Sequence, residues 1–223
     1  MGVIICKNLG IKLDMKAVME RLRVPEDFEE EFADIFAKCE AIADPGYIYT
    51  AMPVRQTEST TFVGEYEFVS KIMYGNFKGQ STVWPYVLTC GRELYDLAAQ
   101  KDDPLERYWV DCIAETYLGA IHPIMHAEVA KLAGVERLYS MNPGSLDDFP
   151  LACQRPLFDM LGDVKAGIGA WLTDSYLILP YKSGSGIYFT SDSHYENCSM
   201  CPRAGCPNRR APYDGMMFET KYA

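Results

Sequence analysis

Three cysteines near the C-terminus have the spacing of metal ligands. Cys198, Cys201 and Cys206 form a C-x2-C-x4-C pattern, and proline follows two of them. Proline keeps the local chain out of a helix, so backbone N–H groups can turn toward the sulfurs, which favours an iron–sulfur cluster. A 4Fe–4S cluster takes four ligands, so the fourth must come from elsewhere in the chain or from outside the protein. The other cysteines are Cys6, Cys39, Cys90, Cys112 and Cys153.

A zinc site is the alternative interpretation of the same segment. His194 stands four residues before Cys198, which completes an H-x3-C-x2-C-x4-C set of four ligands that zinc accepts in a tetrahedral site. A disulfide or free thiols on the tail would account for the cysteines without any metal. The residues therefore leave the metal open, with iron–sulfur favoured by the Cys-Pro steps.

Three other patterns give weaker evidence of chemistry. His122 and His126 are spaced as zinc ligands on one helical face, but Pro123 stands where a zinc protease has its general base. Residues 182–186 (KSGSG) have the glycines of a phosphate-binding loop without its residue order, so a tight strand connection is preferred. Nothing in the spacing pairs Cys153 with a histidine as a catalytic nucleophile, and we expect a buried structural thiol.

The composition is that of an ordinary globular protein. The chain has 223 residues, of which 48% are hydrophobic and 23% charged. Its net charge of −10 repels phosphate backbones and argues against a nucleic-acid partner. No apolar run approaches the ~20 residues of a membrane span. Residues 1–6 lack the basic flank and cleavage site of a signal peptide, so we expect a first strand there and a cytoplasmic location.

Helices and strands are expected in separate runs. Helical periodicity covers residues 15–22 behind Asp14 as N-cap, 25–43, 92–100, 105–133 and 153–161. Strand patterns cover residues 47–50, 60–69, 82–90, 167–172, 176–179 and 186–190, the last three as a meander. Turns are expected at Gly75-Asn76 and Gly79, and Pro85 favours an edge strand or a bulge for residues 82–90. This arrangement predicts an α+β fold, a mainly antiparallel sheet with flanking helices.

Three segments together resemble a known family. Residues 137–145 (RLYSMNPGS), 168–176 (IGAWLTDSY) and 180–186 (PYKSGSG) are similar in order and spacing to the activation domain of cobalamin-dependent methionine synthase. The order and spacing match over about residues 105–197, and the resemblance extends over most of the chain. It implies an activation-domain-like unit over 1–197, with a helical N-terminal part over 1–45. The C-terminal module, residues 198–223, is then an addition that suits a stand-alone activator.

The resemblance implies an accessory function in methyl transfer. Proteins of this family bind S-adenosylmethionine and cover the corrinoid of a partner. After an electron donor reduces inactive cob(II)alamin, the methyl group of S-adenosylmethionine traps the product as methylcobalamin. The protein supplies positioning and electrostatics. We therefore expect a reductive activator of a corrinoid-dependent methyltransferase, of methionine synthase type. The alternative is a non-catalytic binding module or chaperone for a corrinoid protein, with zinc in its tail.

Site residues follow from the same resemblance. Arg137 is expected to hold the carboxylate of the methionine moiety, and the backbone at Pro143 and Gly144 to shape the pocket. Asp174 matches a family glutamate that could face the sulfonium charge. Tyr195 stands about where the family has a tyrosine that contacts the ligand.

Overall fold

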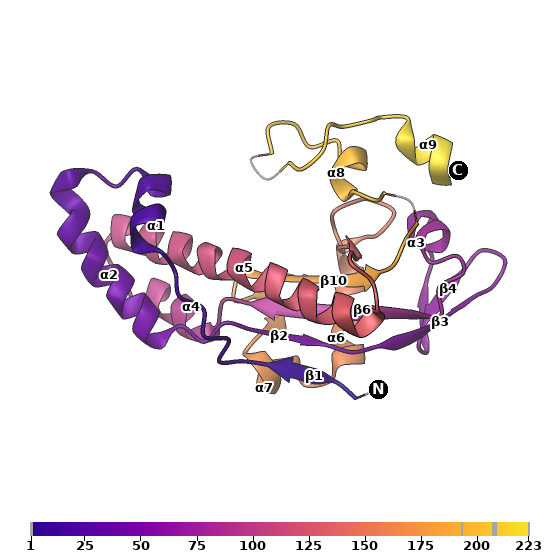
Figure 1. Cartoon of the computed structure of the whole chain (residues 1–223), viewed down its shortest axis with the longest axis horizontal. Helices are drawn as coiled ribbons and strands as arrows, with labels where there is room; N and C mark the ends of the chain where they lie inside the picture. The colour runs from indigo at the N-terminus through magenta and orange to yellow at the C-terminus, as the bar shows by residue number, and fades with distance from the viewer. Residues whose placement is uncertain (1, 193, 207–208, 223) are drawn as a thin grey trace.

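The structure is a computed structural model that describes residues 2–192, 194–206 and 209–222. An antiparallel sheet forms its centre, and helix α5 (Pro104–Ala133) crosses one face (Figure 1). Helices α6 (Gln154–Leu161) and α7 (Val164–Ile168) cover the other face. All strand pairs among the described residues are antiparallel, so the expected α+β class is confirmed.

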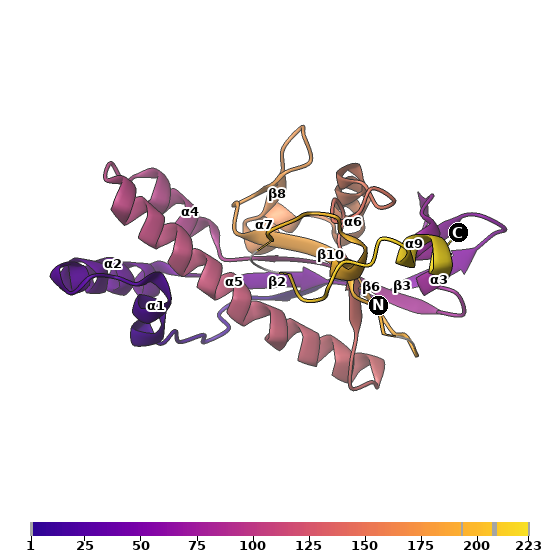
Figure 2. The ribbon, with the colours of Figure 1, turned by 90° about the horizontal axis from the view of Figure 1, so that it is seen from above.

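Strand β6 (Thr82–Thr89) is the centre of this sheet. It pairs with β2 (Gly46–Tyr49) and β3 (Met52–Gln56) along one side, and with β10 (Ser183–Phe189) along the other. The sheet continues through β1 (Ile4–Cys6) beyond β2, β7 (Tyr139–Met141) beyond β10, and the hairpin of β4 (Thr61–Val63) and β5 (Tyr66–Phe68) beyond β3. A separate hairpin joins β8 (Trp171–Leu172) to β9 (Ile178–Leu179), and it protrudes in Figure 2.

The expectation that residues 82–90 form an edge strand is wrong, and the position of Pro85 explains why. The β2 ladder on β6 ends at the pair Tyr49 and Tyr86, and the β3 ladder begins at Val83. Pro85 therefore lies at the junction between two partner strands, where its carbonyl accepts a hydrogen bond from Thr50 N at 3.2 Å. The missing N–H of proline costs little there, because no ladder bond is required at that point.

Four other sequence expectations differ from the structure. Residues 60–69 are not one strand, because Gly64 turns with φ +60° between β4 and β5. Gly75 and Asn76 do not form a turn: they end helix α3 (Lys71–Asn76), which begins after Ser70 as N-cap. The segment 167–172 starts as the end of α7, and β10 pairs with β6 and β7 instead of continuing a meander from β9.

The N-terminal helices gather at one end of α5. Helix α1 (Met15–Leu22) has the expected Asp14 cap, and a 3-10 turn (Glu26–Phe28) leads into α2 (Glu29–Ile42). With α4 (Arg92–Ala99) they bury Phe32 edge-on against Trp109, at 5.5 Å between ring centroids. Helix α5 ends at Ala133, as the expected range 105–133 predicts, and Gly134 forms its C-cap in the left-handed conformation. None of the helices in the described ranges is long and apolar enough to cross a membrane.

The C-terminal module packs at the other end of the molecule. Its helices α8 (Asn197–Met200) and α9 (Met217–Tyr222) bury Met200 and Tyr222 against the core around α3. Outside this module, a second 3-10 turn (Leu151–Cys153) leads into α6. Tyr222 OH donates to Asn76 Oδ1 at 2.9 Å. The α1–α2 end and this module rise on the same side of α5, which gives the molecule a concave outline (Figure 1).

Candidate functional site

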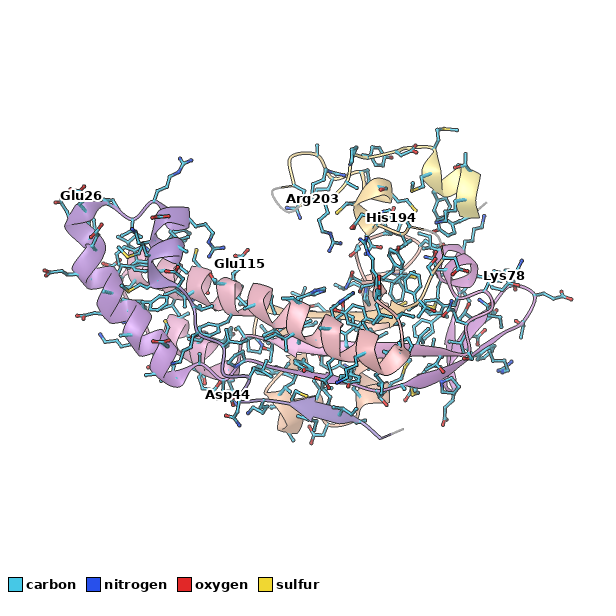
Figure 3. The ribbon with its side chains drawn as sticks, viewed as in Figure 1. Glu26, Asp44, Lys78, Glu115, His194 and Arg203 are labelled. Atoms are coloured by element: carbon cyan, nitrogen blue, oxygen red, sulfur yellow. The ribbon has the colours of Figure 1, made fainter. Side chains whose placement is uncertain are left out.

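A cavity of about 810 Å³ lies on the concave side of the molecule, where α5 runs over the sheet. We call it the large cavity. Helix α5 lines it with Glu115, Gly119 and His122, and strands β6 and β10 line it with Tyr86, Leu88 and Gly184. Arg21 of α1 and Arg210 of the C-terminal module complete its boundary. Figure 3 shows Glu115 rising from α5 on this side, across the opening from the loop that carries Arg203.

A second cavity of about 240 Å³, the small cavity, adjoins the first. Both are lined by His122, Asn142 and Arg210, so the two spaces meet at these residues. The small cavity is also lined by Arg137 and by the consecutive residues Tyr195 and Glu196. The structure thus brings two of the five expected ligand residues, Arg137 and Tyr195, to one cavity.

Glycines keep the β10 floor free of side chains. Ser185 lines the large cavity, but its hydroxyl donates to Gln154 Oε1 of α6 at 3.0 Å on the opposite face of the sheet, so Gly184 and Gly186 face the α5 side. A Cβ atom at Gly186 would lie 2.7 Å from both Tyr86 OH and Asn142 Nδ2, which leaves no room for a side chain. At Gly184 the nearest atom would be 3.9 Å away. Residues 183–186 are therefore a paired strand, with neither a phosphate-binding loop nor a tight connection.

An amide network joins the floor to the C-terminal module. Asn142 Nδ2 donates to Tyr86 OH at 3.0 Å and to Ser185 O at 2.8 Å. Asn142 Oδ1 accepts from Asn197 Nδ2 at 3.1 Å, and Asn197 Oδ1 accepts from Tyr195 OH. The side chain of Tyr195 is only 5% exposed, and burial raises its pKa well above the ordinary value, so it stays a hydroxyl. Sequence reasoning missed both asparagines, since a lone amide has no recognisable spacing.

The two histidines of α5 are occupied by hydrogen bonds. His122 Nε2 lies 3.3 Å from Tyr188 OH, and His126 Nε2 accepts from Leu138 N at 3.1 Å. Burial lowers the pKa of His122, with smaller contributions from His126 and Arg210, so His122 is neutral at pH 7. This geometry places the histidines in packing and hydrogen bonding.

The remaining expected ligand residues lie away from the two cavities. Pro143 and Gly144 follow Asn142 but line neither cavity as the described residues form them. Gly144 instead turns with φ +79° beside Leu151. Asp174 is exposed in the β8–β9 hairpin, whose strands pack on the α6–α7 side of the sheet.

The cysteine loop converges on an arginine. Arg209 Nη1 donates to Cys198 O at 2.8 Å and to Ala211 O at 3.3 Å, and Nη2 donates to Cys201 O at 3.0 Å and to Arg203 O. Over residues 2–192, 194–206 and 209–222, no group of three or more His, Cys, Asp or Glu side chains is placed to hold a metal ion. The described structure therefore gives no support for an iron–sulfur or zinc site, and the assignment of Cys198, Cys201 and Cys206 as metal ligands stays a prediction.

Comparison with known proteins identifies the fold. No family model and no curated protein matches this sequence. Among solved structures, the chain is similar to the crystal structure of the MetH reactivation domain bound to AdoHcy, with a TM-score of 0.61 and 17% sequence identity. The match covers 88% of this chain and 81% of that chain. This similarity confirms the fold expected from the sequence: the chain has an activation-domain-like fold.

Proposed function

We propose that the chain binds an S-adenosyl ligand in the two cavities and acts as an accessory activator of a corrinoid-dependent methyltransferase of methionine synthase type. One observation carries the proposal. Arg137 and Tyr195, the two residues that the sequence resemblance links most directly to ligand contact, line the same cavity. Support also comes from the MetH reactivation domain, which has a similar fold and was crystallised with AdoHcy bound.

The dimensions and chemistry of the cavities suit such a ligand. Small-molecule sites commonly enclose roughly 300–1,000 Å³, and the large cavity has about 810 Å³. The floor has no side chain at Gly184, which allows a flat group to approach the backbone there. Glu115 is a carboxylate on the α5 wall, although Lys182 is 3.2 Å from it. We assign the sulfonium-facing role to this wall and not to Asp174, because Asp174 lines neither cavity among the described residues.

A corrinoid protein is the partner we infer for the concave side. A reduced corrinoid supplies the cobalt nucleophile that accepts a methyl group from S-adenosylmethionine. The residues of this chain would hold the ligand between α5 and the C-terminal module and keep its methyl group accessible to the docked partner. Burial raises the pKa of the Tyr86, Tyr188 and Tyr195 hydroxyls, which stay protonated and hydrogen-bonded within the walls of the cavities. The electron donor is a separate protein or reductant.

The proposed function requires no metal on the C-terminal module. The carbonyl groups of its cysteine loop bind Arg209, and the thiols of Cys198, Cys201 and Cys206 are not gathered with a fourth ligand in the described structure. Metal analysis of the purified chain tests the alternative function. One equivalent of zinc, with no effect of the chain on reductive methylation of a corrinoid partner, would favour a non-catalytic binding module.

Calorimetric titration with S-adenosylmethionine tests the proposal. We expect saturable binding by the unmodified chain and weaker binding by Arg137→Ala, because a charge-assisted pair with the ligand carboxylate is lost. The matched control is Arg203→Ala, which removes the same charge from an exposed residue that lines neither cavity in the described structure. Absence of binding to the unmodified chain would contradict the proposed function, and equal affinities of Arg137→Ala and the control would remove Arg137 from it.

A further inference from the structure

An ion pair marks the place where the two cavities meet the C-terminal module. Arg210 Nη2 donates to Glu196 Oε1 at 2.8 Å. Arg210 lines both cavities and Glu196 lines the small one. We propose that Arg210 and Glu196 together bind the zwitterionic α-amino acid group of the ligand, so that the C-terminal module completes the binding site. This inference rests on the proposed function.

Each partner of the pair has bonding capacity left for a ligand. A guanidinium has five N–H donors, and the only hydrogen bond that Arg210 donates to a carboxylate within the described residues uses one of them. The Arg210 side chain is 60% exposed, whereas that of Glu196 is 15% exposed. Glu196 Oε1 also accepts from Cys198 N at 3.3 Å. In the described part of the chain its hydrogen bonds all use Oε1, so Oε2 is left for a ligand.

The combination of charges selects the ligand class. An α-amino acid presents a carboxylate, which accepts from a guanidinium, and an ammonium, which donates to a carboxylate. A phosphate would be repelled by Glu196, and a simple cation by Arg210. A paired arginine and glutamate at the edge of a cavity therefore match a zwitterion better than either single charge.

The surrounding structure holds the pair in place. Glu196 lies between Tyr195 and Asn197, which are fixed by the amide network to Asn142. Arg210 follows Arg209, whose guanidinium binds carbonyl groups on both sides of the cysteine loop. Both charges are thus anchored by immediate neighbours in the sequence, which lowers the entropy lost when they bind a ligand.

The contribution of Arg137 is different. Its guanidinium lies 5.2 Å above the ring of Tyr139, and it lines only the small cavity. Arg210 reaches both cavities and has an acidic partner that fixes its direction. We therefore assign Arg210 as a second carboxylate anchor, contributed by the part of the chain that the sequence suggested for metal binding.

Titration with two ligands separates the amino acid group from the rest of the ligand. S-adenosylhomocysteine carries the amino acid, and 5′-methylthioadenosine lacks it. We expect Arg210→Ala to bind S-adenosylhomocysteine about tenfold or more weakly than the unmodified chain. Glu196→Gln, which keeps an acceptor at the Oε1 position, should also bind S-adenosylhomocysteine more weakly. Both variants should bind 5′-methylthioadenosine within about twofold of the unmodified chain, as should the Arg203→Ala control for both ligands.

The outcomes distinguish this inference from the proposed function. If the unmodified chain binds S-adenosylhomocysteine and Arg210→Ala binds it equally well, the proposed function stands and the inference is overturned. If Arg210→Ala lost affinity for both ligands equally, the inference would also be overturned. Arg210 would then maintain the shape of the cavity and would not bind the amino acid group. No binding of either ligand to the unmodified chain would refute both. Thermal unfolding of each variant checks that the fold is intact.

Discussion

Burial keeps several titratable side chains around the cavities uncharged. Burial raises the pKa of Tyr86, Tyr188 and Tyr195 and lowers that of His122. These shifts have one cause, since a low-dielectric environment disfavours the charged form of either kind of group. The charges that remain around the small cavity are those of Arg137, Glu196 and Arg210.

His122 gives a pH-dependent prediction at this scale. Its pKa is lowered in the folded state from 6.5, so the unfolded chain binds the proton more readily as the pH falls below about 6.5. The free energy of unfolding should therefore decrease from about pH 7 to pH 5. In His122→Gln this decrease should be smaller than in the unmodified chain. Chemical denaturation at several pH values measures the decrease, and equal slopes for the two proteins would contradict the assignment.

At the scale of elements, strand β10 positions the site through its glycines. Ala at Gly184 has free space, with the nearest atom 3.9 Å from the added Cβ, whereas Ala at Gly186 meets Tyr86 OH at 2.7 Å. We expect Gly184→Ala to change stability by less than about 0.5 kcal/mol but to weaken ligand binding by covering the floor. Gly186→Ala should cost about 1–3 kcal/mol through overpacking. Thermal unfolding and calorimetry on the pair test this, and a stable Gly186→Ala would refute the close packing.

The cysteine loop gives a second prediction for an element. Arg209→Ala removes hydrogen bonds to the carbonyls of Cys198, Cys201, Arg203 and Ala211, so we expect a loss of about 1–3 kcal/mol and faster proteolytic cleavage in the module. Arg203→Ala is the control, because only its backbone takes part. Cleavage at the same rate in both variants would show that Arg209 does not organise the loop.

Elements with local signals were predictable from the sequence. The Asp14 cap and the Gly134 stop each depend on neighbouring residues, and the structure has both. The central position of β6 was not predictable, because Pro85 is tolerated only through the change of partner strand from β2 to β3. The pairing of β10 with β6 was not predictable either, because it joins segments that are far apart in the sequence.

In the candidate site, too, some residues were predictable from the sequence and others were not. The resemblance singled out Arg137 from the motif of residues 137–145 and Tyr195 from its approximate position, and both line the small cavity. Asn142 and Arg210 could not be found from spacing, since each reaches the cavity only through the tertiary packing of distant segments. The spacing of the cysteines predicted metal ligands. It could not show that Arg209 donates hydrogen bonds to the carbonyl groups of the same loop.

For the whole molecule, the concave outline connects the ligand site with a partner. The α1–α2 end and the C-terminal module rise on the same side of α5 (Figure 1). The lining of the large cavity includes Arg21 from α1 and Arg210 from the module. A macromolecule that docks on this side would cover the cavity and exclude water from a bound ligand. The molecule is therefore suited to present a small ligand to a large partner.

The central claim is that an S-adenosyl ligand occupies the space between α5 and the C-terminal module. A crystal structure of the chain with S-adenosylhomocysteine tests it most directly. We predict the ligand over Gly184, with its carboxylate at Arg210 and its ammonium at Glu196. A ligand bound on the α6–α7 side of the sheet, or cavities that stay empty at saturating ligand concentration, would contradict the account.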